Sequence, residues 1–223
     1  MARVTWREAW RVIASKYPPI DLFERVSKAP EVWEALIALE ELTNPRVRDE
    51  VGNIALVDRN DRISGPGASY VMASFTHVNP HGSRFSDGSY GVYYAASNML
   101  TAVAETLHHF EEFCRDASDP IRAEDMRVLL GSVDCEFDSV SDLPSDRVVA
   151  ILDPNSYAAS RVWAAELRES GACGIHYASV RMAGGECIAA FKPKAVRPPK
   201  QERHLRYHWN GSRVDKYFDY TDD

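Results

Sequence analysis

The sequence predicts an α+β protein in which helices and β-strands form one compact unit. Apolar residues recur at helical spacing in much of the first 60 residues, whereas several later stretches are rich in the β-branched and aromatic residues typical of strands. Near the C-terminus, Asn210-Gly211 separates two alternating segments, a pattern that favours a β-hairpin. The 223 residues are 45% hydrophobic and contain no linker rich in Gly, Ser or Pro, which indicates a single core.

The N-terminal part, residues 1–66, is predicted to be a helical extension packed on a core formed by residues 67–223. The apolar residues of its first helix are Trp6, Ala9, Trp10, Val12 and Ile13, and prolines 18 and 19 end that helix. A short second helix follows, a third is expected over residues 30–42, and residues 46–50 are predicted to form a further short helix. The alternative is a separate helical module that binds a partner protein.

A turn, a strand and a helix are expected in succession between residues 81 and 110. Before them, residues 69–76 alternate as a strand. Gly82 and Gly88 allow two tight turns, and residues 91–96 have the composition of a buried strand. Ser97 or Asn98 caps the helix that follows. The apolar face of that helix consists of Leu100, Val103, Ala104, Leu107 and Phe110.

The remaining elements are predicted from alternation, helical spacing and turn residues. Strands are expected at residues 126–135, 175–180 and 186–191, and residues 147–152 are a strand or the start of a loop. Residues 155–170 have helical spacing, with Gly171 as the C-cap. The C-terminal hairpin pairs residues 203–209 with residues 213–218.

Composition and charge argue against several functional classes. A net charge of −7 disfavours a general nucleic-acid binder, because such binding depends on clustered lysine and arginine. The chain lacks a run of about 18 apolar residues and an apolar signal core, so we expect a cytoplasmic protein without a membrane span. The four cysteines form no CxxC pair, and the adjacent His108 and His109 point about 100° apart on a helix, so no metal site is predicted.

Three residues carry the candidate chemistry: Arg84, Tyr94 and Glu105. Tyr94 follows Arg84 by 10 positions and Glu105 follows Tyr94 by 11, which places them in a turn, at a strand end and on a helix. Converging on one cleft, they offer a donor fork for a phosphate or carboxylate, an aromatic hydroxyl, and a general base or ribose partner, which suits a nucleotide-like substrate. The other interpretation, which spacing alone favours, is that Arg84 stabilises the turn, Tyr94 fills the core and Glu105 lies on a solvated face.

The segment GSRFSDGSYGVYYAASNMLTAVAE resembles the signature of the RES-domain family, an arginine turn followed by a short strand ending in tyrosine and a helix with Ala-x-x-Glu. Arg84, Tyr94 and Glu105 fall on the arginine, tyrosine and glutamate of that motif. Downstream, GIHYASVRMAGGECIAAFKP is similar to the segment with the family serine, which assigns that role to Ser179, although the usual preceding proline is Ala178 here. The resemblance extends over roughly residues 67–198. Arg62 is the nearest candidate for a further upstream arginine, and its assignment stays open.

The resemblance implies an enzyme that degrades NAD by hydrolysis or phosphorolysis of the nicotinamide–ribose bond and acts as the toxin of a type II toxin–antitoxin system. It also implies an ADP-ribosyltransferase-like fold, with a mixed or antiparallel β core and flanking helices, in which residues 67–223 are the catalytic domain. NAD is then the substrate, inorganic phosphate is a potential co-substrate, and no cofactor is expected. The expected partner is an Xre-type antitoxin protein, with no nucleic acid or membrane bound by the chain itself.

In the implied mechanism, Glu105 stabilises a positively charged ribose or orients water, and Arg84 binds the pyrophosphate or inorganic phosphate. Tyr94 contacts the nicotinamide ribose, and Ser179 hydrogen-bonds the substrate from the opposite wall. Two alternatives stay open. One is ADP-ribosyl transfer to a macromolecule, and the other is a non-catalytic module that binds NAD or a partner protein.

Overall fold

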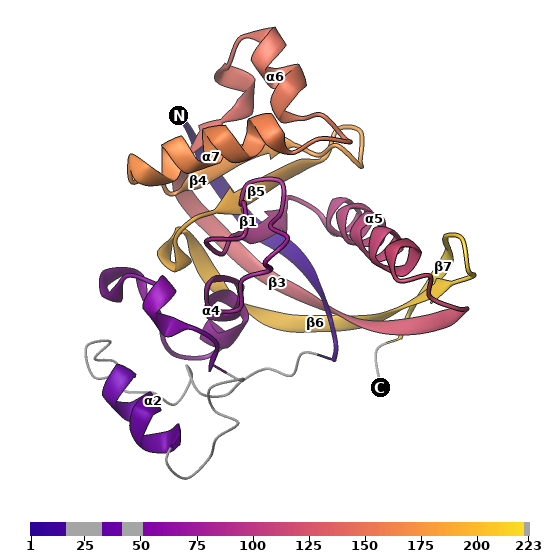
Figure 1. Cartoon of the computed structure of the whole chain (residues 1–223), viewed down its shortest axis with the longest axis horizontal. Coiled ribbons are helices and arrows are strands. Elements are labelled where there is room, and N and C mark those ends of the chain that lie inside the picture. Colours follow the sequence, from indigo (N-terminus) through magenta and orange to yellow (C-terminus); the bar gives the residue numbers. More distant parts are fainter. Residues whose placement is uncertain (17–32, 42–50, 221–223) are drawn as a thin grey trace.

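The computed structural model describes residues 1–16, 33–41 and 51–220. Its centre is a seven-stranded mixed sheet, and five α-helices lie around it in the described part of the chain, which confirms the α+β class (Figure 1). The strands are β1 (Ala2–Ala14), β2 (Tyr93–Ala96), β3 (Arg122–Ser139), β4 (Gly174–Ala178), β5 (Glu186–Ala190), β6 (Val196–Trp209) and β7 (Val214–Asp219). The helices are α2 (Trp33–Glu41), α4 (Ala68–Thr76), α5 (Met99–Asp116), α6 (Ser145–Ile151) and α7 (Ala158–Glu169).

The sheet has the order β1-β2-β5-β4-β3-β6-β7, and β1 also pairs with β3, so its first five strands form a closed ring. Strands β3 and β4 are parallel, and every other pair is antiparallel. β1 follows β3 along most of its length but contacts β2 at a single register position, Trp10 opposite Ala96. The two strands therefore diverge beyond that point, beside α5.

Two hydrophobic clusters hold the helices on the sheet. One cluster contains buried residues of α5 and α7, such as Val103, Phe110 and Trp163. The other contains buried residues of α2 and α4, such as Trp33 and Met72. In Figure 1, α6 and α7 lie together at one end of the molecule and α2 and α4 at the other. No helix in the described ranges is long and apolar enough to cross a membrane.

The prediction of a helix at the N-terminus is wrong, because residues 2–14 form β1, a strand of the central sheet. The register of β1 against β3 shifts between Trp6 and Ala9. Such a bulge breaks the two-residue alternation of a strand, so its apolar residues recur at a spacing that imitates a helix. Pairing with β3 then overrides the local preference. The predicted extension over residues 1–66 thus begins inside the sheet, and its second and fourth predicted helices lie outside the described residues.

Two further assignments are corrected. Residues 69–76, predicted as a strand, belong to α4, where Ala68, Val71, Met72 and Phe75 are buried at helical spacing. Residues 147–152, predicted as a strand or loop start, lie mostly in α6, which begins after Pro144. The apolar residues from 148 to 152 resemble a buried strand in sequence. In the structure, however, Ile151 is the one buried residue among the seven of this helix, and Val149 is exposed.

The other predicted elements are confirmed. Asn98 caps α5 by accepting a hydrogen bond from the Thr101 amide at 2.9 Å. Gly171 follows α7 in the left-handed conformation, with φ of 84°. The C-terminal hairpin turns at Asn210-Gly211 and pairs β6 with β7. The third predicted helix is present as α2, and the strand and helix between residues 91 and 116 are β2 and α5.

Candidate active site

A pocket of about 230 Å³ lies between α5 and the strands β1 and β2. Arg84, Tyr94 and Glu105 all contribute to its wall. The structure therefore brings together the three residues that the local motif singled out. Ser179 reaches this pocket through a hydrogen bond to Glu105.

A glycine turn presents Arg84. Gly82 has a φ of 73°, and a Cβ at this position would lie 2.3 Å from the Ser86 carbonyl oxygen, so only glycine fits. The Ser83 amide donates to that same carbonyl at 2.8 Å, which closes the turn. Arg161, on α7, fixes the turn from outside by donating to the carbonyls of Ser83 and His81, each at 2.9 Å.

The Arg84 side chain is only 8% exposed and is held by the segment before α7. Its Nη1 donates to the carbonyl oxygens of Ile151 at 3.1 Å and Asp153 at 2.8 Å. The guanidinium carbon lies 4.6 Å from the centre of the Tyr157 ring, which also lines the pocket. These neutral partners orient the guanidinium and leave its charge without a carboxylate in the described part of the chain. Such an arginine is suited to bind an anion.

Tyr94 packs in the protein interior and also lines the pocket. Its Oη accepts a hydrogen bond from the Phe85 amide at 3.1 Å and is hydrogen-bonded to Ser83 Oγ at 2.7 Å. Burial raises the pKa of Tyr94 to about 12, so the phenol stays neutral at physiological pH. The hydroxyl anchors the Arg84 turn, and the residue forms part of the pocket wall. For Tyr94, the structural and the functional interpretations are thus compatible.

Glu105 is oriented by Ser179. Ser179 Oγ donates to Glu105 Oε1 at 2.6 Å, and it accepts hydrogen bonds from the backbone amides of Arg181 at 3.2 Å and Met182 at 3.0 Å. Two backbone donors occupy the acceptor side of the hydroxyl, so its single proton points to the carboxylate. Ser179 contacts Glu105 and is not among the residues that line the pocket, so its contact with substrate stays a prediction. The hydrogen bond orients the Glu105 carboxylate.

With NAD, the substrate that the sequence motifs imply, we expect Ser179→Ala to lower kcat about 10-fold while KM changes little, because one charge-assisted hydrogen bond to the Glu105 carboxylate is lost. Ser179→Thr retains the hydroxyl and should recover most of the rate. Steady-state kinetics with NAD for both variants, together with their melting temperatures, would check this. Equal losses in the alanine and threonine variants would show that the backbone around residue 179, and not the hydroxyl, matters.

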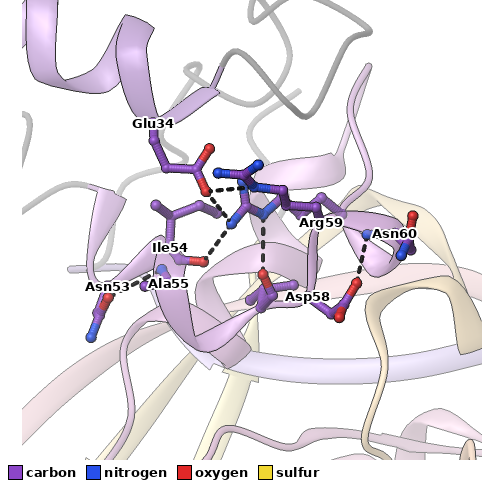
Figure 2. Close-up of polar contacts among 9 residues, drawn as sticks. Glu34, Asn53, Ile54, Ala55, Asp58, Arg59 and Asn60 are labelled. Atoms are coloured by element: carbon purple, nitrogen blue, oxygen red, sulfur yellow. Dashed lines mark hydrogen bonds and ion pairs between the residues drawn. The ribbon is translucent and has the colours of Figure 1, made fainter.

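Arg62, the nearest upstream arginine in the sequence, lies away from the pocket in a structural network. It is buried, and it donates to the carbonyl oxygens of Val57 at 3.1 Å and Ile54 at 3.3 Å. Its Nη2 also pairs with Glu34 Oε1 at 2.8 Å, an oxygen that Arg59 approaches as well. Figure 2 shows these contacts between Glu34 on α2 and the turns that contain Ile54 and Arg59. Arg62 therefore ties α2 to the core.

This network predicts an acid-sensitive contribution to stability. The hydrogen bond from Arg62 lowers the pKa of Glu34 from its ordinary 4.5 to about 2. Because the pKa is lower in the folded state, the stabilisation is complete above about pH 4.5 and is lost as the pH falls toward 2. We expect Glu34→Gln to be less stable than the parent protein at pH 7, with a difference that shrinks over this range. Urea unfolding at several pH values measures it, and a constant difference would contradict the prediction.

A second arginine, Arg11 on β1, does line the pocket. Its Nη1 donates to the Tyr94 carbonyl at 3.0 Å, and its guanidinium carbon lies 4.4 Å from the centre of the Tyr93 ring. Burial lowers the pKa of Arg11, and its Nε is buried without a hydrogen-bond partner among the described residues. Sequence reasoning missed Arg11 because β1 was assigned as a helix. The available signal was a cation between the apolar Trp10 and Val12.

The two adjacent histidines of α5 converge on one carboxylate. His108 Nε2 lies 3.2 Å from Glu112 Oε1, and His109 Nδ1 lies 3.3 Å from Glu112 Oε2. The three ligand atoms lie within 4.8 Å of one another, closer than the expected divergence of neighbouring helical positions suggests. Burial and the nearby Arg181 lower the pKa of His108. His109 also lines the pocket.

The fold and the site define the class of protein: an α+β protein with a small pocket lined by one carboxylate and two arginines. Neither arginine has an ion-pair partner among the described residues. The family model described as "RES domain" matches residues 59–210, more than half of the chain, and the protein therefore belongs to the RES-domain family. This confirms the resemblance carried by the two sequence motifs.

Two individual proteins are also similar. The uncharacterized protein y4oC of Sinorhizobium fredii is 28% identical over 217 residues, which cover 96% of this chain and 88% of that protein. A chain in the crystal structure of the M. tuberculosis MbcT–MbcA toxin–antitoxin complex aligns with a TM-score of 0.44 and 10% identity, covering 98% of this chain and 87% of that one. The latter is a distant likeness of shape.

Proposed function

We propose that this protein is an NAD-degrading enzyme that cleaves the nicotinamide–ribose bond by hydrolysis or phosphorolysis. The observation that carries this proposal is the composition of the pocket: the Glu105 carboxylate, held by Ser179 at 2.6 Å, lies in the same pocket as Arg84 and Arg11. A single carboxylate with two cations suits a substrate that combines an anionic pyrophosphate with a centre that becomes positive during reaction. Membership of the RES-domain family supports the same substrate.

Glu105 is the group that acts on the reacting ribose. Nicotinamide leaves as a neutral base from a cationic ring, so its departure needs little acid catalysis. The transition state gathers positive charge on the ribose, and a fixed carboxylate stabilises that charge more than it stabilises the ground state. The same carboxylate can hold a ribose hydroxyl or orient the attacking water.

The arginines bind the anionic part of the substrate. Arg84 is held by the Ile151 and Asp153 carbonyls through Nη1, so the rest of its fork is available to a pyrophosphate or to inorganic phosphate. Arg11 adds a second positive charge. Tyr94, which stays neutral, contributes aromatic surface to the wall. Tyr157 also lines the pocket. Hydrolysis and phosphorolysis then differ only in whether water or phosphate occupies the acceptor position.

We further propose that the enzyme is the toxin of a type II toxin–antitoxin system. The proposal rests on family membership, since NAD is required by every cell and an enzyme that destroys it must be kept inactive. The partner would be an Xre-type antitoxin that covers the pocket. A net charge of −7 gives this chain itself little affinity for DNA, so DNA binding would belong to the partner.

The test is nicotinamide release from NAD by purified protein free of antitoxin, with and without inorganic phosphate. Release in both conditions indicates hydrolysis, and release that requires phosphate indicates phosphorolysis. NAD labelled in the adenylate distinguishes transfer, because label fixed to protein or nucleic acid identifies an ADP-ribosyltransferase instead. No release under either condition, with folded protein, would overturn the proposal.

A further inference from the structure

A second hollow lies beside the pocket around Glu105, along the same helix. This hollow has a volume of about 310 Å³ and lies between α5, the end of β1 and the beginning of β3. Thr106 and His109 line both spaces. The two hollows therefore lie next to each other between α5 and the sheet.

The size of the first pocket indicates that a dinucleotide needs both spaces. At about 230 Å³, the first pocket lies below the roughly 300–1,000 Å³ of most ligand sites, whereas the two hollows together fall within that range. Phe113, in the second hollow, follows Glu105 by eight positions, which is about 12 Å along a helix. The two bases of NAD are separated by two riboses and a pyrophosphate. A substrate with its nicotinamide ribose at Glu105 must extend its other base away from that residue.

The lining of the second hollow suits a flat, weakly polar base. Phe110 and Met126 line it as buried apolar residues, and Phe113 lines it with 54% of its surface exposed. Lys16 Nζ lies 5.6 Å from the centre of the Phe113 ring and 3.5 Å from Glu124 Oε1. An exposed aromatic ring beside buried apolar residues offers a surface on which a base can stack, and the adjacent lysine and glutamate supply polar groups.

We propose that the second hollow binds the adenosine half of the substrate, with its base stacked against Phe113. The inference rests on the proposed function, because it takes NAD as the ligand of the first pocket. It assigns the preference for a dinucleotide over a mononucleotide to residues of α5 that follow Glu105 in the sequence. A ligand without adenosine then occupies the first pocket alone.

The experiment compares two ligands by titration calorimetry. ADP-ribose contains adenosine, and nicotinamide mononucleotide does not. All variants carry Glu105→Gln so that neither ligand is consumed. Phe113→Ala should weaken ADP-ribose about 10-fold, the expected value of one base–aromatic stack, and leave nicotinamide mononucleotide unchanged. Phe113→Tyr keeps the ring and should bind both ligands as the parent does.

Leu100→Ala is the matched control, because Leu100 lies on the same helix with a similar exposure of 53% and lines neither hollow. Unchanged ADP-ribose binding in Phe113→Ala, or an equal loss for both ligands, would overturn the inference. So would a failure of the parent to bind ADP-ribose. If ADP-ribose binding depends on Phe113 but the protein with Glu105 unchanged releases no nicotinamide from NAD, the proposed function is wrong and the adenosine site is retained.

Discussion

Glu105→Gln is expected to reduce nicotinamide release from NAD by at least about 100-fold, the usual contribution of a positioned acid or base. Glutamine has nearly the same shape, and its amide oxygen can accept the hydrogen bond from Ser179 that the carboxylate accepts at 2.6 Å. The fold should therefore be retained, and the melting temperature should change by no more than a few degrees. What the variant loses is the negative charge that faces the developing positive charge on the ribose.

The measurement is the initial rate of nicotinamide release, with thermal unfolding of the same samples. Glu169→Gln is a matched control, because Glu169 is exposed at the end of α7 and belongs to neither hollow. Full activity in Glu105→Gln would show that the Glu105 carboxylate has no catalytic role, although it lines the pocket. Loss of activity together with a large drop in melting temperature would make the residue structural.

Arg84→Gln is expected to lower kcat/KM for NAD by about 100-fold, chiefly through a higher KM, because the pocket loses a fixed positive charge and a donor fork. Arg84→Lys keeps the charge without the fork and should recover only part of this loss. Both variants also lose hydrogen bonds to the carbonyls of Ile151 and Asp153, so some stability should be lost with either.

Arg161→Gln separates these two effects. Arg161 holds the same turn by donating to the Ser83 and His81 carbonyls, but it does not line the pocket. Arg161→Gln should lower the stability of the protein without the rise in KM that is expected for Arg84→Gln. If Arg161→Gln and Arg84→Gln raise KM equally, the anion-binding role of Arg84 is wrong and the conformation of the turn accounts for the activity.

The candidate site was predictable to the extent that it is local. Arg84, Tyr94 and Glu105 lie within 22 consecutive residues, on a glycine turn, a strand and a helix that each have a clear signal in the sequence. Ser179 was found only through a second motif, and its contact with Glu105 spans 74 positions along the chain. The spacing of the first three residues did not decide between a catalytic and a structural role, because both place the residues on the same elements.

The N-terminal strand shows why the rest was not predictable. Alternation is the main sequence signal of a strand, and the bulge between Trp6 and Ala9 removes it. Because the N-terminal segment was predicted to be a helix, nothing in the sequence indicated that Arg11 lies in the site. Arg62 was the nearest candidate for a further arginine. The structure places Arg62 in contact with Glu34 and places Arg11 in the pocket.

The sequence by itself determined the α+β class, the family, the turn that presents Arg84, the cap of α5 and the C-terminal hairpin. The turn, the cap and the hairpin depend on residues close together in the chain, where steric limits and local hydrogen bonds act without help from the rest of the molecule. The class and the family follow from several such local patterns along the chain. Only the tertiary structure decided that residues 2–14 form a strand, that Arg11 joins Arg84 in the pocket, and that a second hollow containing Phe113 lies beside it. These features depend on strand pairing and burial between segments far apart in the chain, and such contacts outweigh the small energies of local preference.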